Sequence, residues 1–130
     1  MVGDPIGDFI VQIVNAGAVR KESVSVPYSK LKHAIAEKLV ESGFIKNAVK
    51  RGKKVKKTLD IELIYTDGAH MVRGVKRISK PGRRMYAGAQ DIHRVKFGKG
   101  KMILSTPAGV LTGDEARKQN VGGEQLFIIW

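Results

Sequence analysis

The sequence of 130 residues contains no cysteine, and this absence excludes several kinds of chemistry. Without a thiol the chain cannot form a disulfide, hold a metal through thiolates or use a cysteine nucleophile. The chain is still long enough for a core of its own, because a domain of this size buries about two-thirds of its unfolded surface. We therefore expect a folded protein without covalent cross-links, which fits a reducing cytosol.

Long apolar runs are also missing. No stretch approaches the roughly 20 apolar residues that a membrane-spanning helix requires. The first residues, Met1–Pro5, lack the basic and then apolar build of a signal peptide. The sequence therefore predicts a soluble, cytoplasmic protein that does not enter a membrane.

Signatures of catalysis are scarce as well. The histidines at positions 33, 70 and 93 match no spacing of metal ligands. Asp60 and Glu62 alternate with apolar residues, so they are expected on the wet face of a strand. The Gly-Lys-Gly-Lys segment at 98–101 lacks the spacing of a phosphate loop, and no serine stands in a nucleophile elbow. We predict no enzymatic activity, no metal and no cofactor, which disfavours the alternative of a small hydrolase.

The net charge of +12 is unevenly distributed. Residues 1–45 and 102–130 are close to neutral, whereas residues 46–69 hold seven basic against three acidic residues. Residues 70–101 hold ten basic residues against one acidic residue. Clustered charge of one sign is typical of proteins that bind polyanions. Nucleic acid is the predicted partner, and an anionic membrane surface is the alternative.

Residues 1–78 have the pattern of a helix-covered sheet in the order α-β-α-β-β-β. A first helix is expected to begin with Asp4 as N-cap and Pro5 in its first position. A second helix is expected to follow the cap residue Ser29 and to end at Gly43. Strands are expected at 23–26, 44–49, 59–63 and 71–78, the last of them returning after an Asp67-Gly68 turn.

Lys80-Pro81-Gly82 predicts a break between two lobes, so residues 79–130 are expected to form the second one. This lobe is predicted to be mainly β, with one short helix opened by a capping box from Thr112 to Glu115. The predicted fold is therefore an α/β protein of the α+β type in two small lobes. In the second lobe we expect strands at 84–86, 102–106 and 126–130 and a helical turn near 91–95.

Two basic segments are candidates for phosphate contacts. Residues 50–57 carry six Lys and Arg and form either a solvated hairpin loop or a contact that ignores sequence. The second segment includes Arg83 and Arg84 and lies beside Tyr86. A tyrosine near guanidinium groups either stacks on a base or packs between the two lobes.

The segment that begins at Ser105 and Thr106 is nearly neutral but chemically suited to RNA. Two hydroxyls leave a predicted strand for a turn that contains Gly109. Hydroxyls both donate and accept hydrogen bonds, and glycine permits a close approach of the backbone to a ligand. The same residues also fit a plain turn. Gly122-Gly123-Glu124 allows the same two interpretations.

Several segments resemble the small-subunit ribosomal protein eight family, in its bacterial form. The segment 105–112, Ser-Thr-Pro-Ala-Gly-Val-Leu-Thr, is similar to the family's C-terminal signature, as are Glu115-Ala116-Arg117 and 122–124. Matches in the family's order span nearly the whole chain. The further matching segments are Asp4-Pro5-Ile6, 29–32, 41–45 and 79–84 with Tyr86.

The resemblance implies a structural constituent of the small ribosomal subunit. Such a protein binds the central domain of 16S-type ribosomal RNA first, supports assembly and translation, and lies on the ribosome in the cytoplasm. Neighbouring small-subunit proteins are implied partners. Some members also repress translation of their own messenger RNA, and a general RNA- or DNA-binding protein is the alternative.

The RNA-contacting residues follow from the resemblance and from the basic segments together. Pro107 stands where family members often carry a hydroxyl, and Ala108 where they commonly carry lysine, so no contact is carried over to these two side chains. The predicted RNA-binding residues are Ser105, Thr106, Gly109, Gly122, Gly123, Glu124, Tyr86, Arg83, Arg84, Lys30 and Lys32.

Overall fold

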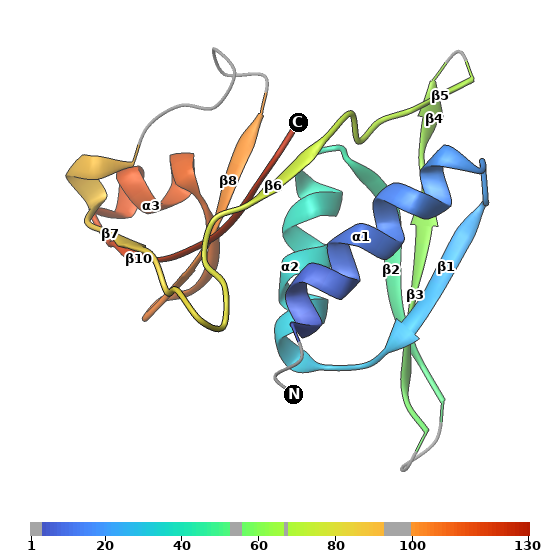
Figure 1. Ribbon diagram of the computed structural model, residues 1–130, viewed down its shortest axis with the longest axis horizontal. Helices are drawn as coiled ribbons and strands as arrows, with labels where there is room; N and C mark the ends of the chain where they lie inside the picture. The colour runs from blue at the N-terminus through green and yellow to red at the C-terminus, as the bar shows by residue number, and fades with distance from the viewer. Residues whose placement is uncertain (1–3, 53–55, 67, 93–99) are drawn as a thin grey trace. The chain divides into compact units, whose positions relative to one another are not determined.

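The computed structural model describes residues 4–52, 56–66, 68–92 and 100–130. It is an α+β protein whose internal contacts divide it into two compact units (Figure 1). The N-terminal unit is Asp8–Arg73, and the C-terminal unit joins Met1–Gly7 to Gly74–Trp130. The predicted α+β class in two lobes is confirmed.

The first two helices begin and end where their free backbone groups find partners. Helix α1 spans Pro5–Ala18, and the Asp4 carboxylate accepts the N–H of its third residue at 3.1 Å. Helix α2 spans Lys30–Glu41, and the Ser29 hydroxyl accepts the N–H of its third residue at 3.0 Å. Gly43 follows α2 with a φ of 84°, the left-handed conformation that glycine adopts most easily. These local signals were correctly predicted.

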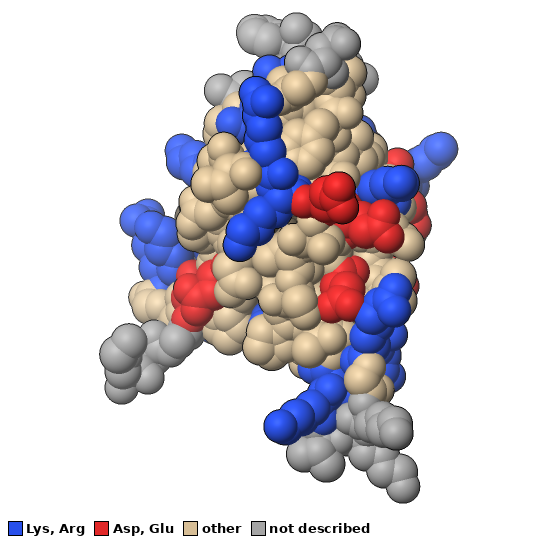
Figure 2. Space-filling view, turned by 90° about the vertical axis from the view of Figure 1, so that its right-hand side faces the viewer, with Lys and Arg blue, Asp and Glu red and all other residues tan. Residues whose placement is uncertain are grey.

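The N-terminal sheet is antiparallel with the strand order β1-β3-β2, and α1 and α2 lie on one of its faces (Figure 1). Leu59 and Ile61 of β3 are fully buried in the core. The other face carries paired charges, such as Arg51 Nε 3.0 Å from Asp60 Oδ2, and basic and acidic side chains alternate there in Figure 2. The strands are β1 (Ser23–Pro27), β2 (Ile45–Arg51) and β3 (Thr58–Leu63), followed by the short hairpin of β4 (Tyr65–Thr66) and β5 (Ala69–His70).

The C-terminal unit is built on an antiparallel sheet with the order β6-β10-β8-β9, and β7 also pairs with β10. Its helix α3, Gly113–Gln119, begins with the predicted capping box. A buried apolar cluster lies on one face of the sheet and includes Leu104 of β8, Leu111 of β9 and Ala116 of α3. The strands are β6 (Val75–Arg77), β7 (Tyr86–Ala87), β8 (Lys101–Thr106), β9 (Gly109–Thr112) and β10 (Gly123–Ile129), and the 3-10 turn η1 lies at Ala89–Asp91.

The prediction for residues 71–78 was wrong in one respect. The sequence predicts that they return onto the N-terminal sheet, but β6 pairs with β10, with Arg77 opposite Phe127. The apolar alternation of a strand shows which face is buried and does not encode its partner. The chain therefore joins the C-terminal unit at Gly74, before the predicted boundary between 78 and 79.

Some predicted features fall outside the described residues. These are the centre of the 50–57 loop at 53–55, Asp67 of the predicted turn, and residues 93–99, which include His93 and most of the predicted helical turn.

His70 of the N-terminal unit packs against Gly17. A Cβ built on Gly17 would lie 1.9 Å from His70 Nδ1, so the missing side chain makes room for the ring. His70 Nε2 is buried without a hydrogen-bond partner among the described residues. Burial lowers the pKa of His70 below its ordinary value of 6.5, since desolvation disfavours the charged ring.

We expect the free energy of unfolding to fall as the pH drops below 6.5. The unfolded chain takes up the His70 proton more readily than the folded one, so this contribution is full above pH 6.5 and is lost towards the lower folded pKa. Urea unfolding at several pH values checks this. The difference in stability between the protein and its His70→Gln variant should shrink or reverse at acid pH, and a pH-independent difference would contradict the assignment.

Candidate nucleic-acid interface

Three predicted residues stand in one row across the C-terminal sheet. Tyr86 of β7 pairs with Glu124 of β10, and Glu124 pairs on its other side with Ser105 of β8. Directly paired residues point to the same face of a sheet. This face, defined by Tyr86, Glu124 and Ser105, is called the recognition face below, and it lies opposite to Leu104 and the buried cluster at α3.

The recognition face carries an exposed aromatic ring, that of Tyr86, and the hydroxyl of Ser105. Tyr86 is 69% exposed, the largest exposed fraction among the large apolar and aromatic side chains of the described residues. Ser105 is half-buried, and no hydrogen bond engages its hydroxyl within the described part of the chain. An exposed aromatic ring can stack on a base, and a free hydroxyl can donate to or accept from RNA.

The carboxylate of Glu124 is held in place by its own unit. Arg84 Nη1 donates to Glu124 Oε2 at 3.1 Å, and the hydroxyl of Ser79 donates to the same oxygen. Ser79 is completely buried and also accepts the N–H of Met85 at 3.3 Å. Two donors therefore orient the carboxylate between Tyr86 and Ser105. Ser79 received no role from the sequence, since nothing local marks a serine whose partner lies 45 residues away.

The hydroxyl of Thr106 serves the turn between β8 and β9. It donates to the carbonyl oxygen of Gly109 at 2.7 Å and accepts the N–H of Ala108 at 3.1 Å. Gly109 has a φ of 109°, a conformation that side chains rarely permit, while the space around it is open. Both residues therefore fix the shape of the turn that follows Ser105.

Gly122 and Gly123 allow strands of this unit to approach one another closely. A Cβ on Gly123 would lie 2.1 Å from the carbonyl oxygen of Ser105, and one on Gly122 would lie 2.4 Å from that of Ala87. Both contacts are with backbone, which cannot rotate away. The Gly-Gly pair thus brings β10 against β8 and β7, which sets the spacing of the recognition face.

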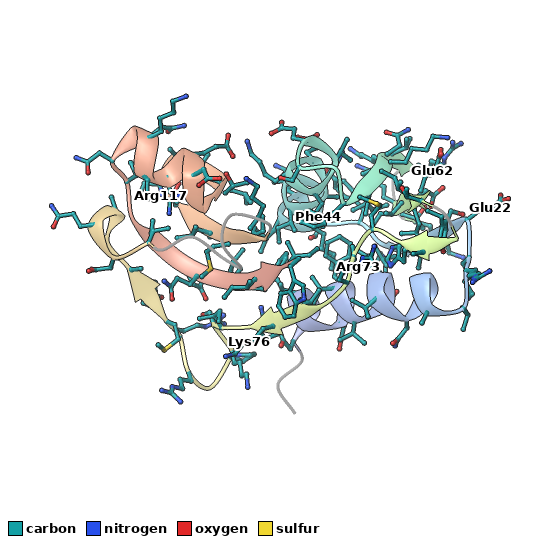
Figure 3. The ribbon with its side chains drawn as sticks, turned by 90° about the horizontal axis from the view of Figure 1, so that it is seen from above. Glu22, Phe44, Glu62, Arg73, Lys76 and Arg117 are labelled. Atoms are coloured by element: carbon teal, nitrogen blue, oxygen red, sulfur yellow. The ribbon has the colours of Figure 1, made fainter. Side chains whose placement is uncertain are left out.

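A group of exposed cations precedes the recognition face in the chain. Lys80 and Arg83 exchange two backbone hydrogen bonds of 2.9 Å around Pro81-Gly82, and the tight turn exposes both side chains. Lys76 projects from β6 (Figure 3). Within the described ranges these cations have no acidic partner, in contrast to Arg84. We call Arg73, Lys76, Lys80 and Arg83 the cationic segment.

Lys30 and Lys32 belong to the other compact unit. Lys30 is the exposed first residue of α2, and Lys32 Nζ lies 3.4 Å from the carbonyl oxygen of Pro27. Nearby, Lys50 Nζ lies 4.8 Å from the centre of the Tyr28 ring. This unit therefore has its own cation and aromatic group, which the sequence did not single out as a pair.

The described residues hold no group of three or more His, Asp or Glu side chains arranged for a metal ion. None of the helices among them is both long and apolar enough to cross a bilayer.

The sequence matches known proteins over nearly its whole length. The family described as Ribosomal protein S8 matches residues 4–130. The small ribosomal subunit protein uS8 of Oleidesulfovibrio alaskensis is 48% identical over 100% of both chains. That of Roseiflexus castenholzii is 47% identical over 99% of this chain and 98% of its own, and that of Mycoplasma mycoides is 47% identical over 100% of both.

These relatives place the chain in the class of small ribosomal subunit proteins. The chain belongs to the ribosomal protein S8 family, and the resemblance predicted from the sequence, including its bacterial type, is confirmed.

Proposed function

We propose that this protein binds the central domain of the small-subunit ribosomal RNA through the recognition face and supports assembly of the subunit. It acts without catalysis, in the cytoplasm, as a component of the ribosome. The observation that carries the proposal is the row of Tyr86, Glu124 and Ser105 across three strands. Family membership supports the ribosomal setting, and the geometry supports this face as the place of contact.

The chemistry of the recognition face suits single-stranded or irregular RNA. Ribosomal RNA offers unstacked bases and 2′-hydroxyls, and proteins read these with aromatic rings and polar groups. Tyr86 supplies the ring and Ser105 the hydroxyl. The Glu124 carboxylate accepts hydrogen bonds and is repelled by phosphate, so it favours a base edge or a 2′-hydroxyl over the backbone.

The roles of the remaining predicted residues are divided by their surroundings. Thr106, Gly109, Gly122 and Gly123 shape the recognition face, because their hydroxyl or their missing Cβ is used inside the unit. Arg84 orients Glu124. Arg83 and the rest of the cationic segment supply attraction to phosphates, which adds affinity without reading the sequence.

Competition and salt titration test the proposal. A fragment of the central domain should displace a labelled copy of itself from the protein at physiological salt, while duplex DNA of equal length should not. The affinity should fall by about 0.7–0.9 log units per log unit of salt for each phosphate that the cationic segment neutralises. Equal competition by DNA would show a general nucleic-acid binder, and binding that ignores salt would exclude the phosphate contacts.

A further inference from the structure

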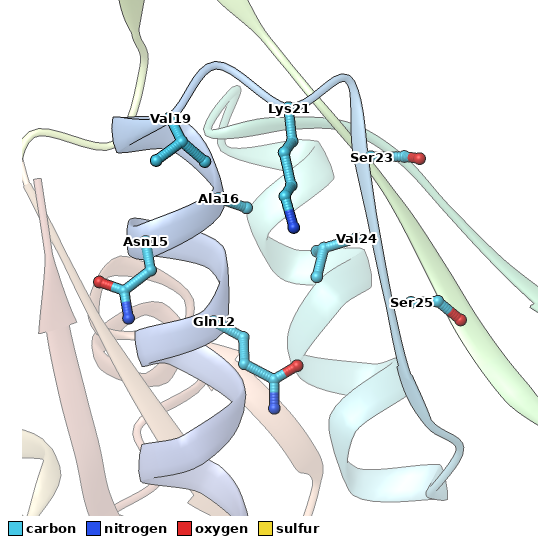
Figure 4. Close-up of a pocket in the computed structure, with 8 residues that line it drawn as sticks. All are labelled: Gln12, Asn15, Ala16, Val19, Lys21, Ser23, Val24 and Ser25. Carbon is cyan, nitrogen blue, oxygen red and sulfur yellow. The ribbon is translucent and has the colours of Figure 1, made fainter.

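A groove runs between helix α1 and strand β1 in the N-terminal unit, whereas the recognition face belongs to the C-terminal unit. Its volume is about 530 Å³. One wall is formed by Gln12, Asn15 and Ala16, which share a face of α1, and by Val19 just after the helix. The other wall is the stretch Ser23–Ser25 of β1, as Figure 4 shows.

Strand β1 is an edge strand that turns free hydrogen-bonding groups towards the groove. Within the described residues it pairs only with β3. The N–H of Leu63 donates to the carbonyl oxygen of Glu22 at 2.9 Å, and the N–H of Tyr28 donates to that of Lys57 at 3.1 Å. Because hydrogen-bonded and non-bonded pairs alternate along an antiparallel ladder, the backbone N–H and C=O groups of Val24 also point towards β3. The backbone N–H and C=O groups of the intervening Ser23 and Ser25 therefore point away from it.

The side chains of the groove are mixed in character. Val19, which follows the last residue of α1, is 67% exposed. Lys21 is the one charged residue of the lining, and its side chain extends into the gap between α1 and β1 (Figure 4). It has no acidic partner within the described part of the chain.

We propose that an extended segment of a neighbouring small-subunit protein adds to β1 as a further strand and lies in this groove. This inference rests on the ribosomal role of the chain and is independent of the recognition face. An added strand would bond to the outward groups of Ser23 and Ser25, as in β-strand addition. An apolar side chain of the segment would cover Val19, and an acidic one would pair with Lys21.

RNA fits the same groove poorly. Phosphate groups only accept hydrogen bonds, so they would leave the outward carbonyl groups of Ser23 and Ser25 without donors. A run of phosphates also calls for several cations, whereas the lining provides Lys21 alone. A polypeptide strand alternates donors and acceptors in the way that a strand edge does.

Photo-crosslinking in reconstituted small subunits tests the proposal. The chain carries a photoreactive phenylalanine analogue in place of Val19 and is assembled with ribosomal RNA and the other subunit proteins. We expect a protease-sensitive cross-link to one segment of a neighbouring protein. Ser25→Pro removes one outward N–H and obstructs an added strand, so the cross-link should fall about tenfold. The backbone bonds to β3 stay intact, since the backbone of Ser25 makes none of them, and only the hydroxyl bond to Asp60 is lost.

Ser25→Ala is the matched control, because it removes the hydroxyl bond to Asp60 at 2.8 Å but keeps the outward N–H. Its cross-link should be unchanged. If Ser25→Pro unfolds the unit, Lys21→Glu serves instead, with Arg20→Glu outside the lining as its control. A cross-link to RNA or to a second copy, none at all, or equal losses in variant and control would overturn the proposal. Retained binding of these variants to the RNA fragment separates this outcome from a failure of the proposed function.

Discussion

Replacing Gly123 by alanine is expected to lower the free energy of unfolding by about 1–3 kcal/mol, the usual effect of overpacking. The new Cβ would meet the carbonyl oxygen of Ser105 at 2.1 Å and the Cα of Thr106 at 3.0 Å. Neither atom belongs to a flexible side chain, so β10 must move away from β8. The displacement changes the distance between Glu124 and Ser105, and RNA affinity should fall with stability.

Gly82→Ala is the matched control for Gly123→Ala. A Cβ on Gly82 meets nothing within 4 Å, and its backbone has no positive φ. The stability of this variant should stay within about 0.5 kcal/mol of the original protein. Urea unfolding of both variants measures the effect. Equal stabilities would show that the two strands accommodate a methyl group, which contradicts the close packing assigned to the Gly-Gly pair.

Replacing Tyr86 by alanine is expected to weaken binding to the central-domain fragment by about 1–3 kcal/mol, the range found when a stacked aromatic ring is removed. The loss corresponds to a factor of roughly 5 to 150 in affinity. The fold should be retained, because the side chain is 69% exposed and stabilises little of the core. Filter binding or fluorescence anisotropy at fixed salt measures the affinity.

Tyr86→Phe distinguishes stacking from hydrogen bonding, since it keeps the ring and removes the hydroxyl. We expect it to retain most of the affinity. The double variant Tyr86→Ala with Ser105→Ala tests whether the two residues act on one RNA segment, because losses at coupled positions do not add. Unchanged affinity in Tyr86→Ala would exclude the recognition face as the contact surface.

Local elements of this protein could be predicted because their signals are local. Asp4, Ser29 and Thr112 each carry a side-chain oxygen that accepts a hydrogen bond from the backbone N–H of the third residue of the helix that follows. Gly43 ends α2 because it adopts a positive φ at little cost. These interactions join residues a few positions apart, so spacing alone identified them.

The candidate site was predicted less completely than the helices. Ser105, Glu124 and Tyr86 were named from the resemblance and from residue chemistry, and their joint location on one face awaited the strand register. Gly122 and Gly123 were expected either to form a turn or to let RNA approach, and the close approach of neighbouring backbone to both was not foreseen. Ser79 was missed because its partner Glu124 comes close only after β10 has paired within the sheet.

The sequence by itself determined the family, the α+β class, the helix ends and the basic character of the chain, since each depends on composition or on short-range spacing. Tertiary structure alone decided that β6 joins β10, that Ser79 and Arg84 hold Glu124, and that the edge of β1 faces a groove. The physical reason is that strand pairing is made by backbone groups common to all residues, so the choice of partner emerges only when the whole sheet is assembled.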